Sequence, residues 1–267
     1  MSEWMGKFAN LYFKNHRDEA NRLKQQNIPK SLFKYQPIRD YNIETLGSNE
    51  LWFSKANALN DPFDCKATYY NINTLTDYLK DKVPSSVIKE LGSIENFIND
   101  GIEHLRSSVR LTCFTESFTN MPMWAHYGDN HQGVCIEYDF SQLPVENDFS
   151  KHLYPVGYES NRYDITNLLR MLFTEDQLDP RINLLFFIML MKHKSWAYEK
   201  EWRILFFNPS PNGGKEKCPI IPKSVYFGLN CSEENIEKIK KVLPNQTKCY
   251  KLEMKNQEYF HVNTVEI

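Results

Sequence analysis

Apolar residues recur along the chain with two different periods, which predict helices and strands. In the N-terminal stretch the recurring positions, at helical spacing among charged residues, are Trp4, Phe8, Leu11 and Tyr12. Pro29 then ends the pattern, because proline cannot continue a helix. We expect residues 1–30 to contain an amphipathic helix that docks on the rest of the chain or on a partner.

Shorter segments alternate with a period of two and predict strands. Residues 50–54 place Leu51 and Phe53 on one face and Trp52 and Ser54 on the other. Other segments with strand character are 33–35, 110–118, 134–138, 202–207 and 224–229. Between them, helical patterns occupy about 72–109 and 165–194.

The order of these elements predicts the fold class. Strands and helices alternate irregularly, and the glycine fingerprint of a dinucleotide-binding parallel sheet is missing. We therefore expect an α+β fold with a mostly antiparallel or split central sheet and flanking helices. Residues 31–267 would form one domain, in which about 72–109 and 165–194 are helical insertions.

Composition and charge limit the classes of protein and of partner that fit this chain. The chain has 41% hydrophobic residues, enough for a sizeable core, and 32 basic against 34 acidic residues, so no global field attracts polyanions. A local basic groove stays open as an alternative. We expect no signal peptide and no membrane span. Six cysteines without a Cys-x-x-Cys pair predict reduced thiols in a cytoplasmic protein.

The most informative segment is Tyr-Glu-Lys-Glu-Trp-Arg at 198–203. If it is extended, Glu199, Glu201 and Arg203 lie on one face and Trp202 on the other. Neighbouring carboxylates raise each other's pKa and an arginine opposes that shift, so the trio suits acid, base or cation-stabilising chemistry. The alternative is a surface ladder of salt bridges.

Residues 124–131 place many polar side chains between two apolar strands. His126 and Tyr127 are candidates to shape a pocket or orient a ligand. The alternative is that Trp124 and Tyr127 anchor the core and His126 is a satisfied buried imidazole. The spacing of His126, Asp129, His131 and Cys135 matches no known metal motif, so we predict no metal site.

The Asn-Asp-Pro-Phe-Asp turn at 60–64 carries Asp61 and Asp64, and a role in fixing the turn is as well supported as a functional one. Ser54, at the end of a strand, is a candidate donor to a ligand. Cys113 and Cys135 lie near histidines in sequence, but burial explains them better than nucleophilic chemistry.

Five motifs in order resemble the bacterial domain-of-unknown-function 2971 family. They are FKY at 33–35, LWFS at 51–54 with LNDPFD at 59–64, MWAHY at 123–127, GVCIEY at 133–138 and YEKEWR at 198–203. Because all five occur in sequence between about 33 and 229, the resemblance is specific.

The layout also resembles, more remotely, the ADP-ribosyltransferase superfamily, particularly DarT-like toxins. That resemblance implies an ADP-ribosyltransferase-like fold, with Tyr35 and Ser54 contacting NAD and Glu201 as the second carboxylate of a Glu-x-Glu signature. Such a carboxylate bonds the ribose 2'-hydroxyl and stabilises the oxocarbenium-like transition state as nicotinamide leaves. Tyr35 departs from the superfamily, which has Arg or His at this position.

We therefore expect an NAD-consuming ADP-ribosyltransferase or NAD glycohydrolase, and the resemblance implies a role as a bacterial toxin or phage-defence effector. Glu201, Glu199 and Arg203 would be catalytic, and the NAD-binding residues would be Tyr35, Ser54, Trp52, His126 and Tyr127. NAD would be the substrate, and the acceptor an unknown protein or nucleic acid.

Two alternatives remain open. A non-enzymatic ligand- or partner-binding module predicts no cleft joining Tyr35, Ser54 and Glu201. A metal-dependent nuclease or other hydrolase requires carboxylates to converge on a divalent cation, namely Asp61, Asp64, Glu137 and Glu201.

Overall fold

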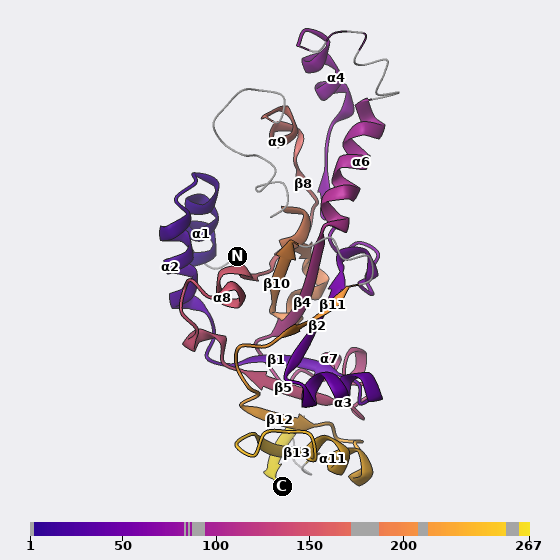
Figure 1. The fold of residues 1–267 in the computed structure, drawn as a ribbon. Coiled ribbons are helices and arrows are strands. Elements are labelled where there is room, and N and C mark those ends of the chain that lie inside the picture. Colours follow the sequence, from indigo (N-terminus) through magenta and orange to yellow (C-terminus); the bar gives the residue numbers. More distant parts are fainter. Residues whose placement is uncertain are drawn as a thin grey trace.

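A computed structural model describes residues 3–82, 84, 86, 94–171, 187–207, 213–254 and 262–267. The described residues form an α+β fold around an open, mostly antiparallel sheet (Figure 1). Eight strands follow the order β11-β2-β4-β1-β5-β12-β13-β14, and β10 and β6 branch from this path because β10 pairs with both β4 and β6. The parallel pair β12–β13 makes the sheet mixed.

The strands of this sheet are β1 (Leu32–Gln36), β2 (Glu50–Lys55), β4 (Val109–Thr115), β5 (Val134–Tyr138), β6 (Leu153–Pro155), β10 (Glu201–Phe207), β11 (Gly214–Lys217), β12 (Ser224–Phe227), β13 (Lys248–Met254) and β14 (Val262–Glu266). Two short parallel pairs lie outside it, β3 (Thr68–Tyr69) with β8 (Tyr163–Asp164) and β7 (Gly157–Glu159) with β9 (Met191–His193).

The α-helices are α1 (Glu3–Phe13), α2 (Arg17–Asn27), α3 (Asp40–Gly47), α4 (Ile72–Lys80), α6 (Ile94–Ser107), α7 (Met121–His126), α8 (Asp148–His152), α9 (Thr166–Met171) and α11 (Glu233–Lys240). Three 3-10 helices complete the description, η1 (Ala56–Ala58), η2 (Phe140–Gln142) and η3 (Lys194–Glu199). Helices α4 and α6 extend beyond one end of the sheet, and α1 and α2 lie beside it (Figure 1).

The sheet forks along one edge of β4. Strand β2 pairs with β4 at Leu111 and Arg110, whereas β1 pairs with it at Thr115. Neither strand pairs with Thr112, Cys113 or Phe114, and we call these three residues the fork. The opposite edge of β4 is paired with β10 along its whole length, so the split affects one edge only.

Alternation along β10 separates the core from the charged residues. Trp202 and Ile204 enter a hydrophobic cluster with residues of β1, β2, β5 and β12, among them Leu32 and Phe53. Trp4 of α1 stacks on Trp202, with ring centroids 6.0 Å apart. The N-terminal apolar stripe therefore docks on the chain's own core.

The structure corrects the predicted N-terminal helix and part of the predicted helical insertion. Asn15 has a φ of 64°, a left-handed conformation that ends α1 before α2 begins, so one predicted helix is two. In the second insertion α9 ends at Met171, residues 172–186 lie outside the described residues, and Met191–His193 form strand β9. The pairing of β9 with β7 outweighs the helical pattern of this segment.

For the first insertion and for the strands, the observed elements agree with those predicted from the sequence. Helices α4 and α6 fall inside 72–109, while residues 83, 85 and 87–93 lie outside the described part. All predicted strands are present, with ends shifted by a few residues. The fold is thus α+β with a mostly antiparallel, split sheet, as predicted.

Two simpler features complete the fold. Each of the six cysteines is a free thiol. Within the described ranges, no helix combines the length and the apolar character that crossing a membrane requires.

Candidate functional site

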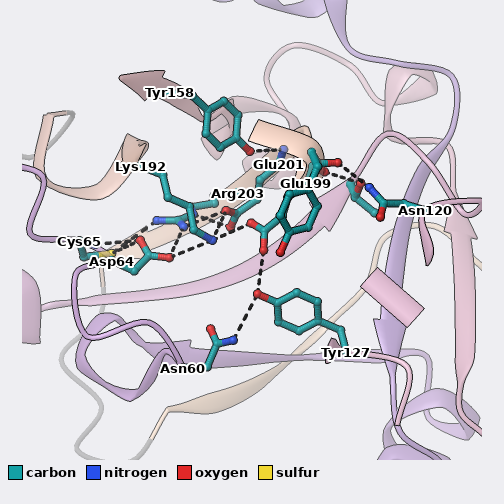
Figure 2. Close-up of polar contacts among 12 residues, drawn as sticks. Asn60, Asp64, Cys65, Asn120, Tyr127, Tyr158, Lys192, Glu199, Glu201 and Arg203 are labelled. Atoms are coloured by element: carbon teal, nitrogen blue, oxygen red, sulfur yellow. Dashed lines mark hydrogen bonds and ion pairs between the residues drawn. The ribbon is translucent and has the colours of Figure 1, made fainter. Parts of the chain in front are cut away.

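The charged residues of β10 lie on the face opposite Trp202, where they form a buried ionic cluster (Figure 2). Glu201 and Arg203 share this face because strand side chains alternate. Glu199 joins them from the end of η3, and Lys200 between the segments takes a left-handed conformation with φ 43°. The face predicted for Glu199 is therefore right, although Glu199 precedes the strand.

Arg203 is completely buried and is the centre of the cluster. Its Nε and Nη2 donate to the two carboxylate oxygens of Glu201, at 2.6 and 2.9 Å. Nη2 also donates to Asp64 Oδ2 at 2.7 Å, and Nη1 donates to the Met189 carbonyl at 2.7 Å. This bidentate geometry fixes the orientation of Glu201.

Lys192, on β9, is the second cation. Its Nζ lies 2.6 Å from Glu199 Oε2, 3.3 Å from Glu201 Oε2 and 3.4 Å from Asp64 Oδ2. The cluster thus contains three carboxylates and two cations. With every member ionised it carries one net negative charge.

The environment separates the pKa values of the two glutamates. Burial pushes the pKa of Glu201 upward, but Arg203 and Lys192 outweigh it and hold that pKa at about 2. Burial and the charge of Glu201 raise the pKa of Glu199 above its ordinary value. Glu201 is therefore a fixed negative charge, and Glu199 is the carboxylate more easily protonated.

Glu199 is also the carboxylate with neighbours from the predicted motifs. Tyr127 Oη donates to Glu199 Oε1 at 2.7 Å, and Asn60 Nδ2 lies 3.2 Å from the same hydroxyl (Figure 2). The Thr115 hydroxyl donates to the Glu199 carbonyl, which ties η3 to β4. Tyr127 thus joins the 60–64 turn to the cluster.

Two adjoining hollows open over this arrangement. The hollow of about 140 Å³, the acid hollow, is lined by Glu199, Glu201, Lys192 and Tyr127. The hollow of about 260 Å³, the fork hollow, lies between β1, β2 and α3 and is lined by Trp52, Ser54 and Tyr41. Four residues line both hollows, namely Lys34, Tyr35, Leu59 and Cys113.

The structure brings most of the predicted ligand contacts to these hollows. Tyr35 lines both, while Ser54 and Trp52 line the fork hollow and Tyr127 lines the acid hollow. Tyr35 directs its hydroxyl to the Ser117 carbonyl, at 3.0 Å, so its ring rather than its hydroxyl is available.

Two of the predicted site residues lie elsewhere. Arg203 lines neither hollow; its Nε and Nη2 bind the carboxylates of the cluster, and its Nη1 binds the Met189 carbonyl. His126 is exposed at the end of α7, where its ring centroid is 6.4 Å from that of Trp196. His126 is therefore not the buried imidazole that the alternative interpretation described, and it lines neither hollow.

The rest of the 124–131 segment is a structural turn. Trp124 is fully buried and donates through Nε1 to the Phe118 carbonyl at 2.7 Å. Asp129, Asn130 and His131 all have positive φ, between 51° and 65°. The ring of His131 stacks on Trp124, so this turn fixes α7 against the sheet.

Three residues of the site were missed or left undecided by the sequence patterns. For Asp61 and Asp64 the sequence left a structural role in the turn and a functional role open. Asp61 has the structural role, because it accepts a hydrogen bond from the Phe63 amide at 2.9 Å, whereas Asp64 belongs to the cluster. Lys192 and Lys34 gave no signal, because the local sequence around a lysine does not show whether its ammonium reaches solvent or a buried site. Only pairing of distant segments brings Lys192 against three carboxylates.

The nuclease alternative finds no support in the cluster. In the described part of the chain no group of three or more His, Cys, Asp or Glu side chains is arranged to hold a metal ion. Glu137 lies instead with Lys223, Ser31 and Tyr226. Burial raises the pKa of Cys113 well above its ordinary value, so its thiol is not an activated nucleophile.

Comparison with known proteins places part of the chain in a family model. Neither the curated proteins nor the solved structures contain a match to the chain. Residues 123–204, which include most of α7, all of β5 and the glutamates of the cluster, match the family model described as protein of unknown function DUF2971. This match confirms, over that segment, the resemblance to the DUF2971 family that the sequence motifs predicted.

Proposed function

We propose that this chain is an NAD-consuming enzyme, a transferase or a glycohydrolase, that acts in the acid hollow. One observation supports the proposal above the others. Tyr35, Ser54 and Glu201, which the motif order assigned to NAD, come from three different strands and line two hollows that share four residues. A non-enzymatic binding module predicted no cleft joining these side chains.

Glu201 supplies a negative charge that is already in place before the reaction. Its pKa of about 2 keeps it ionised, and its bonds to Arg203 hold it rigid. A fixed anion in a dry site stabilises positive charge that develops on the ribose as nicotinamide departs. Arg203 is in this scheme a positioning residue for Glu201, not a residue that touches the substrate.

Glu199 accepts the proton that the reaction releases. The glycosidic C–N bond breaks, and its electron pair leaves with nicotinamide. The oxygen of water or of an acceptor hydroxyl then bonds to the ribose carbon, and its proton passes to Glu199. The raised pKa of Glu199 suits this role, because a general base works best when its pKa approaches the working pH.

The remaining parts of the remote resemblance belong to the same proposal. An ADP-ribosyltransferase-like arrangement accords with a sheet that splits beside the site. A role as a toxin or phage-defence effector, with a protein or nucleic-acid acceptor, would follow from NAD consumption inside the cell.

The test measures nicotinamide release from NAD by the purified protein and by two variants, Glu201→Gln and Glu199→Gln. We expect each variant to lower kcat at least 100-fold, since general acid–base and electrostatic groups contribute about 10²- to 10⁴-fold. Glu199→Gln should also remove the acidic limb of the pH–rate profile, because that limb reports the protonation of Glu199.

Glu253→Gln is the matched control, because Glu253 is exposed on β13 and lines neither hollow. It should keep the wild-type rate. Circular dichroism melts establish that all variants are folded. Equal rates for wild type and both site variants, or no NAD loss by the folded wild type with water or added acceptors, would contradict the proposal.

A further inference from the structure

Lys34 lies at the junction of the two hollows and bridges the fork. It projects from β1 toward β4, where its Nζ donates to the Thr112 hydroxyl at 2.8 Å and to the Cys113 carbonyl at 3.3 Å. Neither β1 nor β2 pairs with these fork residues. The ammonium therefore supplies a hydrogen bond to the Cys113 carbonyl where no neighbouring strand does so on this edge. An ammonium has three donors, and these bonds use two of them.

Lys34 forms no direct ion pair with a carboxylate of the described residues, although the charge of Glu201 reaches it. In the part of the chain that the structure describes, no carboxylate lies within ion-pair distance of its Nζ, and Glu201 is already bound by Arg203 and Lys192. Burial lowers the pKa of Lys34, and the nearby Cys113 and Glu201 oppose that shift without cancelling it. A partly desolvated ammonium that faces a cavity and has no ion pair can be stabilised by an anion that enters the cavity.

The fork hollow beside Lys34 has the features of a site for an aromatic group. Trp52 is 42% exposed and Tyr41 is 54% exposed, and both line it. Within the described residues the Ser54 hydroxyl makes no hydrogen bond, so a donor stands open next to the fork. Glu50, a carboxylate of this hollow, is four residues along β2 from Ser54, roughly 13 Å away at the rise of a strand.

We propose that Lys34 binds a phosphate group of the ligand, and that the attached base lies in the fork hollow beside Trp52 and Tyr41. The ligand class is a nucleoside diphosphate or a molecule that contains one. Its other end enters the acid hollow, which adjoins at Lys34. The identity of the whole ligand rests on the proposed function, whereas the anion site rests on the geometry of the fork.

Binding of unreactive ligands tests this inference without turnover. Titration calorimetry compares ADP with adenosine on wild type, Lys34→Met and Trp52→Ala. We expect Lys34→Met to weaken ADP about 10- to 100-fold, the value of a lost charge-assisted hydrogen bond, and to leave adenosine unchanged. Trp52→Ala should weaken both ligands alike, by about tenfold, because stacking does not depend on phosphate.

Lys30→Met is the control, since Lys30 is an exposed lysine that precedes the same strand and lines neither hollow. It should bind ADP as wild type does. Lys34→Arg should recover part of the ADP affinity, and a melting curve establishes the fold of each variant.

The outcomes separate this inference from the proposed function. If ADP binds through Lys34 but NAD is not consumed, the anion site stands and the proposed reaction falls. If NAD is consumed while Lys34→Met binds ADP as tightly as wild type, the anion site is wrong. No ADP binding by wild type at millimolar concentration also overturns it.

Discussion

Two lysines on facing sides of one site differ in how their charges are balanced. Lys192 lies against three carboxylates, and their attraction raises its pKa despite its burial. Lys34 contacts a hydroxyl and a carbonyl, and burial lowers its pKa. Lys192 is thus held by direct ion pairs, whereas Lys34 forms no direct ion pair with a described carboxylate and lines a cavity.

This difference suggests different roles for the two regions: the ionic cluster holds side chains in place, and the fork is a surface for binding. A buried ion pair contributes little net stability compared with apolar packing, but removing one partner leaves the other charge uncompensated. The cluster is therefore suited to hold Glu201 and Glu199 in place. The fork lacks such compensation, so a ligand can supply it.

Removal of the central cation of the cluster should have the largest effect. Arg203→Met leaves Glu201 and Asp64 buried with a single cation nearby, so we expect a loss of about 3–5 kcal/mol in the free energy of unfolding. Urea denaturation measures it. Arg162→Met, at an exposed arginine, should change stability by less than about 0.5 kcal/mol. A loss under 1 kcal/mol for Arg203→Met would show that the cluster is not a scaffold.

Acid should weaken the cluster by a slightly smaller amount. The pKa of Glu201 is about 2 in the folded protein against an ordinary value of 4.5, so its stabilisation is complete above pH 4.5 and is lost as pH falls toward 2. The expected loss is about 3 kcal/mol, and Glu201→Gln should lack it. Unfolding free energies across this range test the point, and parallel curves for the two proteins would refute it.

Alkali should have the smallest effect, at the fork. The pKa of Lys34 is lowered by burial, so between that pKa and 10.5 the unfolded chain binds more protons than the folded one. Wild type should then gain stability relative to Lys34→Met as pH rises toward 10.5, because the folded chain gives up the Lys34 proton more easily than the unfolded chain does. Denaturation at pH 7 and pH 10 measures it. If the unfolding free energies of both proteins changed equally with pH, the charge of Lys34 would be as well solvated in the folded chain as in the unfolded chain, and the prediction would be wrong.

Local sequence patterns predicted the strands and the direction of key side chains. The alternation in β2 correctly placed Leu51 and Phe53 in the core and Trp52 outside it. The alternation in β10 separated Glu201 and Arg203 from Trp202. These predictions succeed because the period of a strand is a property of its own backbone. The single helix predicted at the N-terminus failed because Asn15 adopts a left-handed conformation that periodicity does not reveal.

By itself, the sequence determined the α+β class, the faces of the strands, the DUF2971 resemblance and the choice of Glu199 and Glu201. Only the tertiary structure decided that Arg203 is buried, that Lys192 contacts three carboxylates and that Lys34 lies at a fork without a direct ion pair. Periodicity describes neighbours along one strand, whereas charge balance depends on which distant strands pair and where pairing stops. The arrangement of this site is therefore set by the pairing of β1, β2 and β10 with β4 and by the pairing of β9 with β7.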